Sequence, residues 1–191
     1  IGQGVIKELK KYIKKYNPKN IYIITDDIVN KLYINDLIEI IKDFNYHVYV
    51  IPNGEQAKNF DTVTSIYDHL IENNMDRNTL ILSFGGGVVG DITGFVAATY
   101  KRGLKYIQIP TTLLAQVDSS FGGKVGINYK NYKNIIGSFY LPEIIVVDIE
   151  FLKTLDKRQI TCGLAEVLKY GLIYDYDFFK FVSCNINRIY S

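Results

Sequence analysis

Short apolar runs rich in β-branched and aromatic residues alternate along this chain with segments of helical periodicity. The apolar runs cover residues 20–25, 46–51, 79–84, 106–109 and 144–147, and helical segments cover 26–43, 59–74 and 91–100. A strand followed by a helix and then by another strand is typical of a parallel sheet with crossover helices. The pattern therefore predicts an α/β fold: a Rossmann-like parallel sheet with helices on both faces.

The last part of the chain has a different pattern. Residues 158–173 and 174–189 have helical periodicity, with no predicted strand between them. We therefore expect a domain boundary near Leu155. Residues 1–155 would form the α/β domain, and residues 156–191 would begin an all-helical domain.

Composition and charge exclude several classes of protein. The chain of 191 residues is 48% hydrophobic and 22% charged, which is unlike a disordered protein. A net charge of +2 gives no electrostatic reason to expect nucleic acid as a partner. No apolar run approaches the roughly 20 residues that span a bilayer, so we expect no membrane partner. Cys162 and Cys184 form no disulfide framework, which favours the reducing cytoplasm. Because the first residue is Ile1 and Met75 is the only methionine, we expect a piece of a longer chain.

A glycine-rich segment follows the third predicted strand. Residues 85–90 read GGGVVG and match the pattern G-x-G-x-x-G, between a strand and a helix. Glycine lets the backbone approach a phosphate closely, and the helix dipole favours the anion. However, Lys105, about twenty residues further on, is not the acidic residue of the usual dinucleotide fingerprint. The pattern alone leaves open a tight glycine turn that serves packing.

Polar residues follow the other predicted strands at the same edge of the sheet. They are Asp26, Glu55, Lys58, Asp91 and Thr111. Ligands of open α/β sheets bind outside the carboxyl ends of the strands. Carboxylates at that edge can accept hydrogen bonds from ribose hydroxyls, and Lys58 can offset phosphate charge.

Residues 99–134 combine many polar groups with glycine. The polar residues are Arg102, Thr111, Thr112, Asp118, Ser119, Ser120, Lys124, Asn128, Lys133 and Asn134. One interpretation is a solvated surface loop, because irregular segments are normally polar. Interspersed apolar residues favour a partly buried cluster instead. Such a cluster could hold a phosphorylated, polyhydroxylated substrate.

Glu166 and Lys169 are three residues apart on a predicted helix and so share a face. From spacing alone we favour an exposed ion pair. Neither His47 nor His69 has metal-ligand spacing to the other or to Glu166, and we expect both to be structural or solvent-exposed.

Five blocks of this sequence resemble the 3-dehydroquinate synthase family, in order and at matching spacing. They read PNGEQAK, GGGVVGDITGFVAATYKRG, QIPTTLLAQVDSSFGGKVGIN, YKNIIGSFYLP and LKTLDKRQITCGLAEVLKYGLI. The resemblance implies a lyase that converts 3-deoxy-arabino-heptulosonate 7-phosphate to 3-dehydroquinate and phosphate. This is a step of the shikimate pathway of aromatic amino acid biosynthesis. The resemblance also implies NAD, a divalent metal (zinc or cobalt) and a homodimer.

The resemblance assigns a role to each matching position. The cofactor-binding residues would be Asp26, Glu55, Lys58, Gly86, Gly87, Val88, Asp91, Thr111, Thr112, Leu114, Phe151, Thr154 and Leu155. The catalytic and substrate-binding residues would be Asp118, Lys124, Lys133, Asn134, Lys169 and Arg102, the last reaching substrate phosphate across a dimer interface. Glu166 would be one of three metal ligands, which differs from the ion pair that spacing favours. The family's other two ligands are histidines of the C-terminal helical domain, and this chain ends before them, so we expect the chain alone to be inactive.

Three alternatives remain open at this stage. The chain could come from another sugar-phosphate cyclase, which would share most of these blocks. It could come from an NAD- and metal-dependent polyol dehydrogenase, which would not be expected to combine Lys124, Lys133, Asn134, Glu166 and Lys169. It could also be an NAD-binding fragment with no chemistry of its own.

Overall fold

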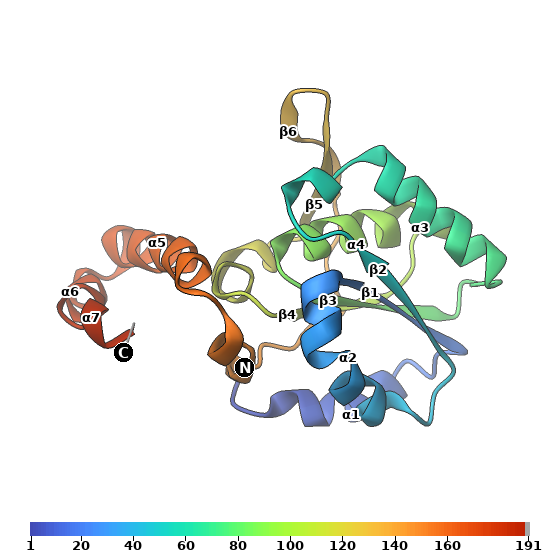
Figure 1. The fold of residues 1–191 in the computed structure, drawn as a ribbon, viewed down its shortest axis with the longest axis horizontal. Coiled ribbons are helices and arrows are strands. Elements are labelled where there is room, and N and C mark those ends of the chain that lie inside the picture. Colours follow the sequence, from blue (N-terminus) through green and yellow to red (C-terminus); the bar gives the residue numbers. More distant parts are fainter. Residues whose placement is uncertain (190–191) are drawn as a thin grey trace.

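A computed structural model describes residues 1–189, and a parallel five-stranded sheet forms its centre (Figure 1). The strands are β1 (Asn20–Asp26), β2 (Tyr46–Ile51), β3 (Thr79–Gly85), β4 (Tyr106–Pro110) and β7 (Ile144–Ile145), in the spatial order β2-β1-β3-β4-β7. Neighbouring strands pair in parallel, with Ile23 opposite both Val48 and Leu82. All carboxyl ends therefore lie at one edge of the sheet. The predicted strands are confirmed, although β7 is shorter than expected.

Helices cover both faces of the sheet. Figure 1 shows α1 (Leu9–Lys14) and α2 (Asp27–Ile41) on one face, and α3 (Phe60–Glu72) and α4 (Gly87–Thr99) on the other. The predicted α/β class is thus confirmed. Helix α4 begins four residues earlier than expected, because most of the glycine-rich segment forms its first turn.

Alternating residues of the strands fill two separate cores. On β1, Tyr22 and Ile24 belong to the cluster beneath α3 and α4, whereas Ile21 and Ile23 belong to the cluster that packs on α1 and α2. All four side chains are fully buried. A strand buried on both faces needs a continuous apolar run, which is why β1 could be recognised from sequence.

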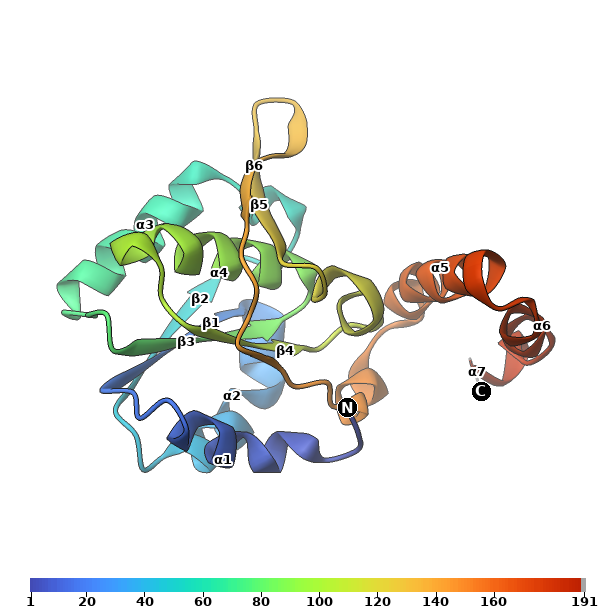
Figure 2. The same ribbon diagram turned by 180° about the vertical axis from the view of Figure 1, so that it is seen from behind.

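An antiparallel hairpin, which the sequence did not predict, lies within the polar segment. Strands β5 (Lys124–Tyr129) and β6 (Tyr132–Phe139) pair with each other, and the hairpin projects beyond α3 and α4 in both views (Figures 1 and 2). Its base rests on α4, where a Cβ on Gly94 would overlap Val125. The alternative of an irregular surface loop is therefore wrong for residues 124–134, although most of β6 is exposed. Glycine, lysine and asparagine, which have low strand propensity, interrupt the β-branched and aromatic residues of both strands, so the strand pattern was not recognised in the sequence.

The chain ends in helices that lie to one side of the sheet. A 3-10 segment η5 (Ile149–Thr154) leads to α5 (Lys157–Tyr174), α6 (Tyr176–Cys184) and α7 (Ile186–Ile189) (Figure 1). The predicted helical segment 174–189 is interrupted at Asn185. Residues 190 and 191 lie outside the described part, and a separate domain beginning at residue 156 stays a prediction. Within residues 1–189, no helix has both the length and the hydropathy to cross a bilayer.

Candidate functional site

A cavity of about 600 Å³ lies at the carboxyl edge of the sheet. Loops that follow β1, β2, β3 and β4 meet there because the strands are parallel. The cavity is lined by every residue that the resemblance assigns to the cofactor: Asp26, Glu55, Lys58, Gly86, Gly87, Val88, Asp91, Thr111, Thr112, Leu114, Phe151, Thr154 and Leu155. The fold thus gathers residues that are up to 129 positions apart, from Asp26 to Leu155.

Two glycines of the segment 85–90 serve packing. A Cβ on Gly85 would lie 2.5 Å from Val89 Cγ2, and a Cβ on Gly90 would overlap the Gln108 side chain. These glycines let α4 lie close to β3 and β4. The packing interpretation therefore holds for this pair.

Gly86 and Gly87 have different surroundings, because both line the cavity. Gly86 is the N-cap of α4 and supplies no side-chain cap, so the first backbone N–H groups of the helix have no side-chain acceptor there. A Cβ on Gly86 would lie 3.0 Å from Thr112 Cγ2, and one on Gly87 would lie 3.0 Å from Ser119 Oγ. Free N–H groups at the positive end of a helix dipole suit a diphosphate.

Two buried hydroxyls at the cavity wall lack partners. Thr111 Oγ1 and Ser119 Oγ are inaccessible to solvent and have no hydrogen-bond partner among the described residues. Both residues line the cavity. Burying an unpaired hydroxyl costs about 1–3 kcal/mol, and a polar ligand at this wall would relieve that cost. Together with the glycine wall, these hydroxyls show that the residues present fit a dinucleotide such as NAD.

Asp26 both caps helix α2 and lines the first cavity. It is the N-cap of α2, where its Oδ1 accepts hydrogen bonds from the backbone N–H groups of Ile28 at 3.0 Å and Val29 at 2.9 Å. It also lines the cavity. Burial raises the pKa of the Asp26 carboxyl, and the two backbone hydrogen bonds oppose this rise. Only the cofactor role was expected of Asp26; the cap was missed, although the helical period that follows this residue signals it.

Lys58 is buried and its amino group is bound inside the protein. Lys58 Nζ donates to Asp91 Oδ2 and to Asn134 Oδ1, each at 2.5 Å. Burial raises the pKa of the Asp91 carboxyl, and the adjacent ammonium of Lys58 works against this rise. The positive charge of Lys58 is therefore balanced by Asp91. The expectation that Lys58 offsets phosphate charge stays a prediction, and in this structure the amino group is already paired with a carboxylate.

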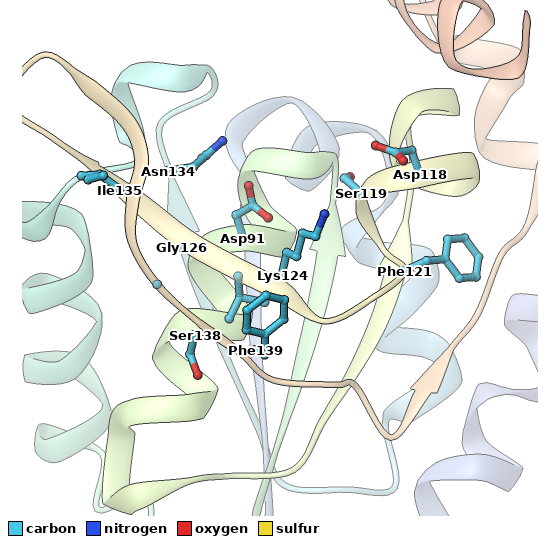
Figure 3. A pocket seen from close by; sticks show the side chains of 12 residues that line it. Asp91, Asp118, Ser119, Phe121, Lys124, Gly126, Asn134, Ile135, Ser138 and Phe139 are labelled. Atoms are coloured by element: carbon cyan, nitrogen blue, oxygen red, sulfur yellow. The ribbon is translucent and has the colours of Figure 1, made fainter. Parts of the chain in front are cut away.

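A second cavity, of about 530 Å³, adjoins the first and shares Asp91, Ser119 and Asn134 with it. Asp118 and Lys124 line only this second cavity, and Figure 3 shows their side chains converging on the same space as those of Asp91 and Asn134. An ammonium group beside carboxylates and an amide can bind a polar, hydroxylated molecule.

The remaining candidate residues are placed differently. Lys133 lines the first cavity and not the second. Arg102 is exposed in η3 (Tyr100–Arg102), at the opposite end of α4 from Gly86, and lines neither cavity. Its expected reach across a dimer interface stays a prediction.

Helix α5 brings Glu166 and Lys169 near the second cavity without lining it. Glu166 pairs with Lys169, as the spacing predicts, and this contact raises the pKa of the lysine. The next residue, Tyr170, donates to Asp118 Oδ1 at 2.8 Å, which raises the pKa of the tyrosine hydroxyl. Asp118 lies in a π-helical turn, η4 (Ala115–Ser119), that packs on α5.

The described residues do not by themselves fit a metal site. Among residues 1–189, no group of three His, Cys, Asp or Glu side chains could hold an ion. His69 Nδ1 lies 2.8 Å from Tyr22 Oη, which is a structural contact as expected. Glu166 is therefore a single carboxylate paired with lysine, and one carboxylate alone does not make a catalytic metal centre.

These features define a parallel α/β fold with a ligand cavity at the carboxyl edge of the sheet, and solved structures share it. The 2-epi-5-epi-valiolone synthase from Streptomyces hygroscopicus subsp. jinggangensis 5008, with NAD+ and Zn2+ bound, superimposes with a TM-score of 0.88 at 31% identity. That match covers 97% of this chain and 52% of the synthase. A 2-deoxy-scyllo-inosose synthase complexed with carbaglucose-6-phosphate, NAD+ and Co2+ gives 0.85 at 29% identity, covering 90% and 47%.

The sequence comparison is more specific. A family model described as 3-dehydroquinate synthase N-terminal matches residues 48–162. The 3-dehydroquinate synthase of Clostridium acetobutylicum is 51% identical over 183 residues, covering 94% of this chain and 51% of that protein. This chain belongs to the 3-dehydroquinate synthase family. It spans about half the length of the curated relatives it matches.

Proposed function

We propose that this chain is the NAD-binding half of a 3-dehydroquinate synthase, which converts 3-deoxy-arabino-heptulosonate 7-phosphate to 3-dehydroquinate and phosphate. The observation that carries the proposal is the cavity lined by all the cofactor positions of the family blocks. Membership of the family, and two curated relatives of that name at 44% and 51% identity, favour this activity. The second candidate is another sugar-phosphate cyclase, because two such enzymes share the fold at 29–31% identity.

NAD would lie along the carboxyl edge of the sheet. Asp26 and Glu55 supply carboxylates for the hydroxyls of the adenosine end, and Gly86 and Gly87 let the diphosphate approach the start of α4. When bound, NAD supplies reversible hydride transfer. The hydroxyl of Ser119 lies where the two cavities meet and can hydrogen-bond to the nicotinamide end.

The second cavity would hold the sugar phosphate. Lys124 Nζ offers a positive charge to oxygen atoms that become negative during the reaction, while Asp118 and Asn134 orient hydroxyl groups. Lys133, which lines the first cavity, would face substrate and the nicotinamide end from the hairpin, and Lys169 would contact substrate from α5. Arg102 would bind the phosphate held by a partner subunit of a homodimer. The exposed, unpaired cysteines agree with a cytoplasmic protein.

The metal would be zinc or cobalt, with Glu166 as one ligand. Since residues 1–189 supply no group of three ligands, the remaining ligands would come from outside this chain. We therefore expect the 191-residue chain to release no phosphate from the heptulosonate phosphate. Metal analysis together with a phosphate-release assay tests this, and clear turnover by the isolated chain would refute it.

Calorimetric titration of the chain with NAD+ tests the cofactor site. Gly87→Val places a branched side chain against Ser119 Oγ, 3.0 Å from the Cβ position. We expect it to weaken NAD+ binding more than about tenfold, because it blocks the approach of the diphosphate. Ala98→Val is the control, since it adds a branched side chain to α4 outside both cavities. Equal affinity of Gly87→Val and wild type would refute the diphosphate position.

The particular cyclase is tested on the full-length protein. Mass spectrometry of the product formed from 3-deoxy-arabino-heptulosonate 7-phosphate should show 3-dehydroquinate. A different cyclised product from another sugar phosphate, with no turnover of this one, would favour the second candidate.

A further inference from the structure

The hairpin β5–β6 contains a bulge at the point where it passes the cavity. Ile127 pairs with Ile136 and Tyr129 pairs with Tyr132, so Asn128 alone faces the three residues 133–135. Bulges bend a strand and redirect side chains, and they are common beside active sites. Here the bulge directs Lys133 and Asn134 to the cavity wall.

Asn128 makes three hydrogen bonds, all of them to residues that line the first cavity. Its Nδ2 donates to Glu55 Oε1 at 2.9 Å, and its backbone N–H donates to Lys58 O at 2.8 Å. Its Oδ1 accepts from the backbone N–H of Asn134 at 2.8 Å. Asn128 itself lines neither cavity. It therefore joins the bulge to the segment that carries Glu55 and Lys58.

The hydrogen bond from the Asn134 N–H to Asn128 replaces a backbone hydrogen bond between β5 and β6, which the bulge interrupts at this point. Asn134 has φ +53°, in the left-handed region, and lies where the register of the two strands shifts. A non-glycine residue in this region costs about 1 kcal/mol and persists only where its surroundings hold it. In turn, Asn134 Oδ1 accepts from Lys58 Nζ, and Lys58 binds Asp91. The orientation of Asn128 thus affects four residues of the cavity wall.

We propose that Asn128 is a positioning residue for the cofactor: it holds the Glu55 carboxylate and the Lys133–Asn134 bulge in the orientation that NAD requires. This inference rests on the proposed function, since it takes NAD as the occupant of the cavity. Neither the motif G-x-G-x-x-G nor the carboxyl edge of the sheet points to this residue. Its role depends on hairpin pairing.

Two variants distinguish the effects of the two hydrogen bonds that the Asn128 side chain makes, one with Glu55 and one with the Asn134 N–H. Asn128→Ala removes both, whereas Asn128→Asp keeps an acceptor for the Asn134 N–H and replaces the donor to Glu55 by a second negative oxygen. We expect each variant to weaken NAD+ binding about tenfold, a typical cost of losing a hydrogen bond to a charged group. Asn131→Ala is the matched control, because Asn131 is an exposed asparagine in the turn of the same hairpin. It should bind NAD+ like wild type.

A rescue shows whether the contact itself matters. In Asn128→Asp combined with Glu55→Gln, the new amide can donate to the new carboxylate, so the contact is restored with donor and acceptor exchanged. Because Glu55→Gln alone also removes a carboxylate from the cofactor cavity, its own loss of affinity is measured as well. The double variant should bind NAD+ at least about threefold more tightly than the two single losses added together predict. Wild-type affinity in Asn128→Ala, or losses in the double variant that are simply the sum of the two single losses, would overturn the proposal.

Amide hydrogen exchange at Asn134 gives a readout that does not require NAD+. Exchange should be slow in wild type and Asn128→Asp, and fast in Asn128→Ala. If wild type fails to bind NAD+, the proposed function fails, and the exchange result still tests whether Asn128 holds the bulge. Slow exchange in Asn128→Ala would refute that role.

Discussion

Removal of the Lys58 ammonium should lower the free energy of unfolding of the protein, and the size of this decrease should depend on pH. The side chains of Lys58 and Asp91 are 4% and 21% exposed, and Nζ lies 2.5 Å from Oδ2. Lys58→Met keeps most of the buried stem and leaves the Asp91 carboxylate without its cation. Breaking a buried pair costs about 3–5 kcal/mol, and since a fifth of Asp91 is exposed we expect about 3 kcal/mol at neutral pH.

The sign of the pH dependence follows from the pKa of Asp91. Burial already raises this pKa, Glu55 raises it further, and Lys58 is the cation that lowers it. Without Lys58 the pKa rises more. A carboxyl whose folded pKa is raised contributes stability below its unfolded pKa and loses that contribution as pH rises through the folded pKa. The loss caused by Lys58→Met should therefore be smaller near pH 5 than near pH 7.5, by about 1 kcal/mol.

Urea unfolding followed by circular dichroism at the two pH values measures both effects. Lys58→Met combined with Asp91→Asn should recover much of the stability at neutral pH, because it removes the uncompensated charge. Lys42→Met is the matched control, since Lys42 forms an exposed pair with Glu39 and should change nothing measurable. A loss below about 1 kcal/mol, or one that does not change with pH, would refute the buried pair as described.

Three further predictions concern other contacts. Asp148→Ala should lower the free energy of unfolding, measured in urea, by about 2–4 kcal/mol, and should make the N-terminus accessible to proteases. The reason is that the fully buried Asp148 carboxylate accepts hydrogen bonds from the backbone N–H groups of Gly4 and Ile6. An unchanged free energy of unfolding would contradict this. Gly163→Val should speed hydrogen exchange in α5, because its Cβ would lie 2.5 Å from Leu113 Cγ; unchanged exchange contradicts it. NAD+ at about 100 times its Kd should stabilise the chain by about 2.7 kcal/mol in thermal unfolding; no shift argues against the cofactor site.

The local patterns were sufficient for the sheet and for one side-chain pair. The apolar runs of β1 and β3 are buried on both faces, so their composition alone identifies them. The Glu166–Lys169 pair depends only on helical spacing and was predicted correctly. The roles of the glycines in residues 85–90 were only partly predicted. The pattern could not distinguish Gly85, which packs against Val89, from Gly87, which lines the cavity.

The contacts that organise the site could not be predicted from local sequence patterns. Lys58 meets Asn134, 76 residues away, and Asn128 meets Glu55, 73 residues away. No periodicity links such pairs, since their distance depends on how the hairpin docks on α4. The neutralisation of Lys58 by Asp91 was missed for the same reason.

The sequence by itself determined the strands, the helices and the edge of the sheet where ligands gather, because these follow from the period and the chain direction of short segments. Its motif blocks also determined the family. Only the tertiary structure decided that residues 124–139 form a hairpin, that its bulge brings Asn134 to the cavity, and that Asn128 connects the bulge to Glu55. These features depend on hydrogen bonds between distant strands and loops, whose partners are set by packing of the whole chain and not by neighbours in sequence.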